Sequence, residues 1–218
     1  MPVAPLFDVD CRRCPRLASY LDEVKVQYPD YHARPVPSFG PRRSRLLIVG
    51  LAPGVHGANR TGRPFTGDYA GRLLYETLHG LGLSSKPESV HRRDGLKLKD
   101  CRITNAVKCV PPQNKPVGAE VRNCNDFLGA ELAAAAPGGV ILALGGVAHG
   151  AILKALGLKL RAFPFGHGNE HRLDDGRWLV DSYHCSRYNT QTRRLTTTMF
   201  RRVVRRARTL ARIPPEGG

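Results

Sequence analysis

Short apolar runs recur along the chain and predict buried β-strands. Each run is bounded by glycine, proline, asparagine or charged residues, as is typical of strands that end in turns. The runs are Leu46–Val49, Ile103–Val107, Val140–Leu144 and Trp178–Val180.

Stretches with a helical spacing of apolar residues alternate with these runs. The strongest is Glu120–Ala135, which ends before Pro137 and Gly138. The others are Cys14–Tyr28, Tyr69–Leu81, Gly146–Leu156 and a last helix from about Arg193 to Ala211. This alternation predicts an α/β fold with a parallel sheet covered on both faces. No repeat or long linker divides the chain, so we expect one domain over residues 1–218.

The balance of charge indicates a class of partner. The chain carries 34 Lys and Arg against 18 Asp and Glu, a net charge of +16. Such a surplus favours a polyanionic partner, most commonly nucleic acid. The alternative is an arginine-rich surface that serves only solubility. The arginines of the last predicted helix, Arg201, Arg202, Arg205, Arg206 and Arg208, fit either reading.

Hydropathy gives an expected location. No apolar run approaches the roughly 20 residues that cross a bilayer. The segment Met1–Asp10 lacks the basic start and apolar centre of a secretion signal. We therefore expect a cytoplasmic, nucleoid-associated monomer with no membrane partner.

Chemically distinctive residues follow each predicted strand. In open parallel sheets, ligands bind outside the carboxyl ends of the strands. We therefore expect a binding site formed by the segments that follow the four runs, which are Gly50–Gly54, Lys108–Pro112, Gly145–Gly146 and Ser182–His184.

Four of the six cysteines form a candidate metal site, namely Cys11, Cys14, Cys109 and Cys124. Four thiolates can hold a 4Fe–4S cluster or close a tetrahedral zinc site. The wide spacing of the second pair favours the cluster over zinc, and four buried reduced cysteines are the plain alternative. Cys101 and Cys185 are expected to be ordinary buried residues.

The loop from Gly50 to Asp68, GLAPGVHGANRTGRPFTGD, is rich in glycine, which lets a backbone approach a ligand closely. Its Arg60 and Arg63 can meet phosphates. Phe65 could stack on a flipped base. Asp68 precedes a predicted helix, so capping that helix is its alternative function. The loop has neither the Gly-Lys-Ser/Thr of a Walker A motif nor the glycine spacing of a dinucleotide fingerprint.

Three stretches, GLAPGVHGANRTGRPFTGD, ITNAVKCVPPQNKP and SYHCSRYNTQT, resemble those of the family 5 (type B) uracil-DNA glycosylases. The likeness runs from Cys11 to about Phe200, and the four cysteines fall where that family carries its cluster ligands. It implies a three-layer α/β/α sandwich with a four-stranded, mainly parallel sheet. It also implies a monofunctional glycosylase that flips uracil out of DNA and leaves an abasic site. Hypoxanthine and other deaminated bases stay open as substrates.

The resemblance also implies roles for single residues. Gly50, Ala52 and Gly54 belong to the first motif, Phe65 stacks on the base and Asn105 reads the uracil edge. Many relatives carry a polar or acidic residue where this chain has Ala52, and family 5 is thought to use the downstream acid, here Asp68. His184 stabilises negative charge on the base, and Asn189 matches a position implicated in catalysis. The residues expected on the DNA side are Arg60, Arg63, Lys115, Ser186 and Arg187.

Two other functions remain open at this point. A non-catalytic binding module would use the same charge and cysteines but would not need Asp68, His184 and Asn189 to converge. A glycosylase-like protein that bonds covalently to its product carries a basic, His-containing insertion after the first motif, and the chain shows no such insertion.

Overall fold

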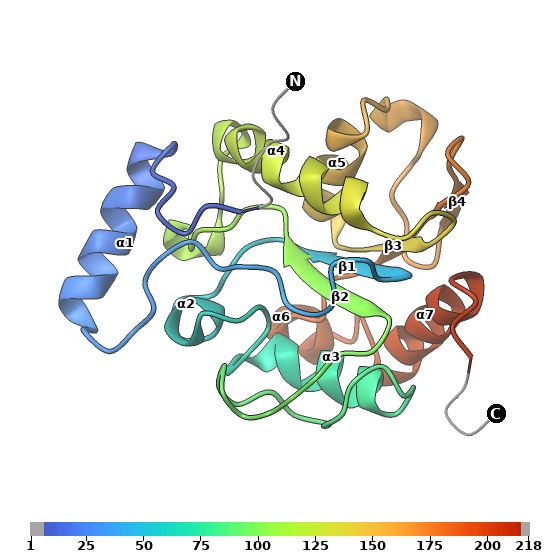
Figure 1. Cartoon of the computed structure of the whole chain (residues 1–218), viewed down its shortest axis with the longest axis horizontal. Coiled ribbons are helices and arrows are strands. Elements are labelled where there is room, and N and C mark those ends of the chain that lie inside the picture. The colour runs from blue at the N-terminus through green and yellow to red at the C-terminus, as the bar shows by residue number, and fades with distance from the viewer. Residues whose placement is uncertain (1–6, 215–218) are drawn as a thin grey trace.

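A five-stranded sheet forms the middle layer of the protein (Figure 1). The computed structural model describes residues 7–214. The strands are β1 (Leu46–Gly50), β2 (Cys101–Asn105), β3 (Val140–Leu144), β4 (Glu170–Arg172) and β5 (Trp178–Ser182). Their order across the sheet is β2-β1-β3-β5-β4, and every pair is parallel except β4 with β5.

The predicted α/β class with a mainly parallel sheet is confirmed, but the predicted number of four strands is too low. The extra strand, β4, is a three-residue edge strand of Glu170, His171 and Arg172, with Glu170 and Arg172 exposed. It has no apolar run, so the hydrophobic pattern could not reveal it. Strand β2 also begins and ends two residues earlier than the run that predicted it.

Helices and 3-10 turns connect the strands. They are α1 (Pro15–Gln27), α2 (Ala58–Thr61), α3 (Tyr69–His79), η1 (Pro112–Asn114), α4 (Gly118–Ala134), α5 (Gly146–Ala155), η2 (Leu160–Ala162), α6 (Arg187–Gln191) and α7 (Thr197–Leu210). Helix α7 begins four residues after the predicted start at about Arg193. The chain turns at Arg193 (φ 57°), and Thr196 caps the new helix by accepting a hydrogen bond from Met199 N at 3.2 Å. No helix within the described residues is long and apolar enough to cross a membrane.

Two helical layers cover the sheet. Helices α4 and α5 lie above it in Figure 1, and α3 and α7 lie below. On the first face, Leu128 and Ile152 pack against the sheet residues Val49 and Ile141. The second face is buried in the same way by apolar side chains of α3 and α7, among them Leu74, Leu78, Phe200 and Val204. A β-strand buried on both faces must be apolar throughout, as the strands β1 and β3 are.

Helix α1 lies to one side of the sheet (Figure 1). Its Leu17 and Leu21 pack with Val107, Val110 and Phe127, which come from the segment after β2 and from α4. This third apolar cluster joins the N-terminal part of the chain to the rest of the fold, and the four candidate cysteines lie in or against it.

Candidate active site

A cavity of about 450 Å³ opens at the edge where the parallel strands end. The volume lies within the range of small-molecule sites, roughly 300–1,000 Å³. Of the residues proposed from the sequence, those that line it are Ala52, Gly54, Phe65, Asp68, Asn105, His184, Ser186 and Arg187. The remaining wall residues are Leu51, Ala58, Tyr69, Ala70 and Asn114. Loops that are far apart in the sequence therefore meet in one wall.

Phe65 is a buried aromatic wall of the cavity. Its ring lies 5.9 Å from that of His184, with 28° between the two planes. The residue adopts a left-handed backbone (φ 53°), which carries a steric cost for a side chain other than glycine. A Cβ atom at Gly50 would lie 2.6 Å from the Phe65 ring and 2.5 Å from Asn105 Oδ1. Only glycine at position 50 lets β1 pass this closely beneath both side chains.

Asp68 serves two functions in this arrangement. Its Oδ1 accepts a hydrogen bond from Gly71 N at 2.7 Å and so caps helix α3. The same side chain lines the cavity. Burial raises the pKa of the carboxyl group, and the bond from Gly71 opposes that rise. A Cβ atom at Gly57 would lie 2.7 Å from Asp68 Oδ2, so the glycine loop closes tightly over the acid.

His184 follows β5 and faces Phe65. Burial lowers the pKa of its imidazole to about 4, so the ring is neutral at physiological pH and keeps one N–H donor. The backbone on either side is held in place. Asn189 Nδ2 donates to the His184 carbonyl at 2.8 Å, and Tyr183 N donates to His167 Nδ1 at 3.1 Å.

Asn105 presents an acceptor that no described residue satisfies. The residue ends β2 and is 4% exposed, and its Oδ1 has no hydrogen-bond partner within residues 7–214. Buried polar atoms are normally paired, so an unpaired one in a cavity wall is best explained by a ligand or a water. The amide oxygen of Asn105 is thus suited to an N–H donor of a bound base.

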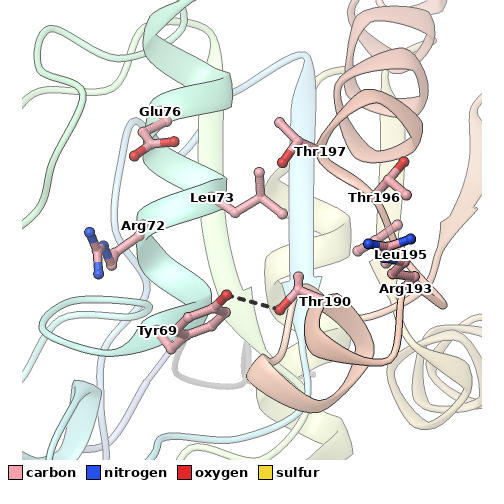
Figure 2. A pocket seen from close by; sticks show the side chains of 9 residues that line it. All are labelled: Tyr69, Arg72, Leu73, Glu76, Thr190, Arg193, Leu195, Thr196 and Thr197. Atoms are coloured by element: carbon pink, nitrogen blue, oxygen red, sulfur yellow. Dashed lines mark hydrogen bonds between the residues drawn. The ribbon is translucent and has the colours of Figure 1, made fainter.

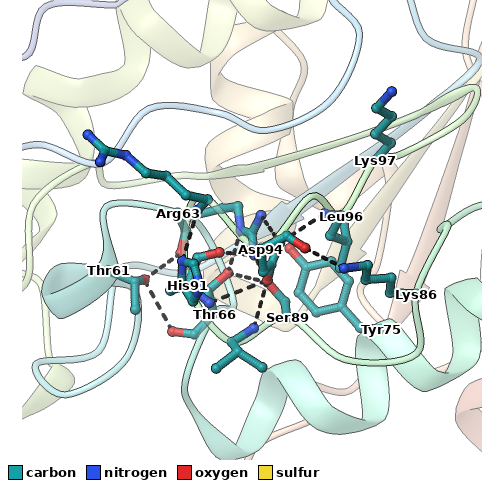
Figure 3. A network of polar contacts seen from close by, with 12 residues as sticks. Thr61, Arg63, Thr66, Tyr75, Lys86, Ser89, His91, Asp94, Leu96 and Lys97 are labelled. Atoms are coloured by element: carbon teal, nitrogen blue, oxygen red, sulfur yellow. Dashed lines mark hydrogen bonds and ion pairs between the residues drawn. The ribbon is translucent and has the colours of Figure 1, made fainter.

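The position of Arg63 contradicts the prediction that this residue contacts a DNA phosphate. It is 4% exposed and lies in a polar network, not on the surface (Figure 3). Its guanidinium pairs with Asp94 and donates to Ser89 Oγ at 2.6 Å and to the His91 carbonyl at 2.7 Å. A buried, paired guanidinium cannot reach a DNA phosphate, so the predicted phosphate contact is wrong for this residue.

The other predicted DNA-side and catalytic residues are placed differently. Arg60 and Lys115 are exposed, and the Arg60 Nε donates to the His56 carbonyl at 2.8 Å. Asn189 does not line the cavity and acts on it only through the carbonyl of His184.

Tyr69 and Asn114 line the cavity and were missed by the sequence analysis. Tyr69 lines the cavity, and the Arg187 guanidinium lies 5.2 Å from the centre of its ring. An exposed aromatic directly after Asp68 was the available signal. Asn114 carried no such signal, because it reaches the cavity only through the folding of its loop.

The four candidate cysteines converge on one region. Cys109 and Cys124 are buried within the apolar cluster beside α1, and Cys11 and Cys14 pack against it. Burial raises the pKa of Cys109, and the other three thiols raise it further. Two N–H groups point at sulfur, from Lys108 N to Cys124 at 3.4 Å and from Asn123 Nδ2 to Cys14 at 3.5 Å.

Two further observations bear on the cysteines. No group of three or more His, Cys, Asp or Glu side chains in residues 7–214 is arranged to hold a metal ion. Cys101 and Cys185 are fully buried, as expected.

Comparison with known proteins agrees with this site. The sequence model of the Uracil DNA glycosylase superfamily matches residues 37–208. The type-5 uracil-DNA glycosylase of Thermus thermophilus is 49% identical, over 92% of this chain and 94% of its own. That of Pyrobaculum aerophilum is 46% identical, over 91% and 88%. The type-4 uracil-DNA glycosylase of Archaeoglobus fulgidus is 30% identical, over 89% and 87%. From its fold, its cavity and these relatives, the chain belongs to the uracil-DNA glycosylase superfamily and, within it, to the type-5 family.

Proposed function

We propose that this protein is a monofunctional DNA glycosylase that hydrolyses the bond between uracil and deoxyribose and leaves an abasic site. The observation that carries the proposal is the meeting of Phe65, Asp68, Asn105 and His184 in one cavity. The type-5 relatives are named for this activity, and this chain matches most of their length.

Recognition of the base falls to Phe65 and Asn105. A base can enter the cavity only after it leaves the duplex, at a cost of a few kcal/mol. The Phe65 ring offers it an apolar surface, and the unpaired Oδ1 of Asn105 accepts its N3–H. Cytosine has no proton at N3, so this contact selects uracil over cytosine.

Bond cleavage falls to His184 and Asp68. As the glycosidic bond breaks, its electron pair moves onto uracil and the sugar develops oxocarbenium character. The neutral His184 imidazole donates an N–H to the base oxygen where the negative charge accumulates. Asp68 Oδ2 orients a water toward the sugar carbon and stabilises the cation, while Oδ1 remains on Gly71 N.

Contacts with the rest of the DNA fall to the rim. Ser186 and Arg187 lie at the start of α6, where they line the cavity entrance and can enter the duplex as the base leaves. Arg60 and Lys115 are exposed and can contact phosphates. Asn189 is a positioning residue that keeps His184 in place.

The four converging cysteines Cys11, Cys14, Cys109 and Cys124 fit a 4Fe–4S cluster. Cluster sulfurs commonly accept N–H hydrogen bonds, and Lys108 N and Asn123 Nδ2 are placed to donate them. Zinc is the alternative group for the same four cysteines, because four thiolates can also close a tetrahedral zinc site. The cluster would join the N-terminal segment to the sheet and supplies a structural link only.

A wider substrate range follows from Ala52. Its small side chain lines a cavity of about 450 Å³, which leaves space beside a pyrimidine. We therefore include hypoxanthine and other deaminated bases as candidate substrates.

Release of free base from DNA tests the proposal. Duplex oligonucleotides that carry one uracil, hypoxanthine or xanthine are incubated with excess enzyme, and the freed base is identified by mass. Uracil should be released, and thymine and cytosine in the same sequence context should stay attached. A protein that binds the uracil duplex and releases nothing would be a binding module, contrary to the proposal.

The remaining expectations concern the state of the enzyme. We propose that it acts as a monomer, as one domain over residues 1–218, in the cytoplasm where its DNA lies. Residues 1–6 and 215–218 of that range lie outside the described structure. Light scattering of the purified protein tests the monomer, and a stable dimer would contradict it.

A further inference from the structure

A second hollow adjoins the active-site cavity. It is a groove of about 660 Å³ between helix α3 and the segment that runs from α6 into α7 (Figure 2). Leu73 and Leu195 form its apolar base, and Arg72, Arg193 and threonine hydroxyl groups form its sides. None of these residues has a role in the reaction described above.

Tyr69 is the boundary between the cavity and the groove, because it lines both. Its hydroxyl accepts a hydrogen bond from Thr190 Oγ1 at 3.1 Å (Figure 2), and Arg187 lies over its ring. The two hollows therefore adjoin at a single side chain, which the hydroxyl group of Thr190 on α6 contacts.

The charge of the groove favours an anion. Arg72 and Arg193 are exposed and form no ion pair with a carboxylate in the described part of the chain. Glu76, the one acid in the lining, lies a helical turn beyond Arg72 and two turns from Tyr69. The end nearest the cavity is thus the more positive, and the hydroxyl group of Thr190 lies beside it, bonded to Tyr69.

We propose that this groove binds the phosphodiester backbone of the damaged strand next to the flipped nucleotide, with Arg72 and Arg193 on its phosphates. The inference rests on the proposed function, because the strand is located by the nucleotide in the cavity. A DNA strand is continuous, so its neighbouring phosphates must leave the cavity across the rim. The unpaired guanidinium groups of Arg72 and Arg193 lie beyond Tyr69, where their positive charge complements the phosphates on that path.

A second arginine-rich hollow provides the control. It lies at the opposite edge of the sheet, where the strands begin, and Arg43 and Arg212 are among its lining residues. Both are exposed, and Arg212 has a left-handed backbone, as Arg193 does. The pair Arg43→Gln/Arg212→Gln therefore removes the same charge as Arg72→Gln/Arg193→Gln, far from the cavity.

The first test is the salt dependence of binding to a duplex with one tetrahydrofuran abasic-site analogue. Each phosphate contact contributes about 0.9 to the slope of log affinity against log salt. The Arg72→Gln/Arg193→Gln protein should lose two contacts, so its slope should be less steep than wild type by about 1.8. The control variant should keep the wild-type slope. Equal changes in the two variants, or none in the groove variant, would overturn the proposal.

The second test locates the contact on the DNA. Single phosphates on either side of the analogue are replaced by uncharged methylphosphonates. At the phosphates that the groove holds, neutralisation should weaken wild-type binding and leave the groove variant unaffected, because the partner is already gone. A scan in which every position weakens both proteins equally would contradict the assignment.

Failure of this inference can be told apart from failure of the proposed function. The binding measurements use an analogue that no glycosylase can process, so they do not depend on base release. If the wild type releases uracil but the groove variant keeps the wild-type slope of log affinity against log salt, only the groove proposal is refuted. If the slope changes in the groove variant but the wild type releases no base from any substrate, the enzyme assignment is refuted.

Discussion

Asp68 shows how one carboxylate can be both structural and reactive. One oxygen caps helix α3, and the other accepts no hydrogen bond within residues 7–214 and faces the closed glycine loop. The helix cap fixes the side chain, so the free oxygen is oriented before any substrate arrives. The choice between cap and catalyst that the sequence left open thus resolves into a residue placed to do both.

Asp68→Asn should separate the two functions. Asparagine caps a helix about as well as aspartate, so stability should change by less than about 1 kcal/mol. The charge that orients water and stabilises the sugar cation is lost, and we expect single-turnover uracil release to fall by about 10²–10⁴-fold. Wild-type release by a fully folded variant would remove Asp68 from the mechanism.

His184 predicts a specific pH dependence. Its pKa of about 4 lies below the ordinary value near 6.5, so the neutral donor persists from pH 8 down to about pH 5. Uracil release should show no change that depends on the titration of His184 over that interval, and any such change should centre near pH 4. Protonation costs folding energy in the same direction, because the unfolded chain takes up the proton first as the pH drops through about 6.5.

The matching variant is His184→Ala. We expect it to lose about 100-fold or more in single-turnover rate at pH 7, as removal of an oxyanion donor typically does. It should also lose the inflection near pH 4. A rate close to wild type would refute the role of the imidazole.

The sequence could locate the site residues that lie at the ends of the parallel strands or in the segments that follow them. Phe65, Asn105 and His184 were placed correctly at one edge, because parallel strands bring their ends together. Arg63 was misplaced, since its partner Asp94 lies 31 residues away and no local pattern links them. Burial of a charged side chain depends on such distant pairing, which a single sequence does not display.

At the scale of the element, the Arg63 network holds a long loop in place. The segment between α3 and β2 has no helix or regular strand, yet Asp94 accepts from Arg63 and from the backbone of Val90 and Leu96 (Figure 3). Burial raises the pKa of Asp94, but the hydrogen bonds from Arg63 and from the backbone of Leu96 and Val90, together with the Arg63 charge, outweigh it and hold that pKa well below its usual range.

Arg63→Met should destabilise the fold strongly. The guanidinium is 4% exposed, and its removal leaves Asp94 without its counter-charge, a change that typically costs about 3–5 kcal/mol. Urea unfolding measures it. The exposed neighbour Arg60→Met is the control and should change stability by no more than about 0.5 kcal/mol. Similar small effects for both variants would show that the network carries little energy.

Elements that lack an apolar pattern were the ones the sequence missed. The edge strand β4 is made of charged residues and pairs only with β5. Helix α6 has five residues and no buried side chain, so no apolar pattern predicted it, and the last predicted helix began only after it, at about Arg193. Both depend on neighbours already in place, whereas β1 to β3 and α4 carry their own burial signal.

At the scale of the whole molecule, the cysteines connect distant parts of the chain. Cys11 and Cys14 precede α1, Cys109 follows β2 and Cys124 lies within α4. A group bound by all four would fix α1 against the sheet in addition to the apolar contacts of Leu17 and Leu21.

Cys109→Ser tests this link. We expect the variant to lose iron and visible absorbance and to unfold several degrees below the wild type, because each kcal/mol corresponds to roughly 2–4 °C for a chain of this size. Cys101→Ala is the control, because this cysteine is equally buried but lies outside the cluster region, and it should keep its iron. A colourless wild type with one zinc per chain would reject the iron–sulfur assignment.

The order of the strands has a consequence for the protein during its synthesis. The wall opposite Phe65 comes from His184, which follows β5, the last strand to be made. A chain that stops before that point contains β1 to β3 but has no imidazole to face the ring. We therefore expect an unfinished chain to release no uracil, so that the enzyme becomes active only after nearly the whole polypeptide has emerged.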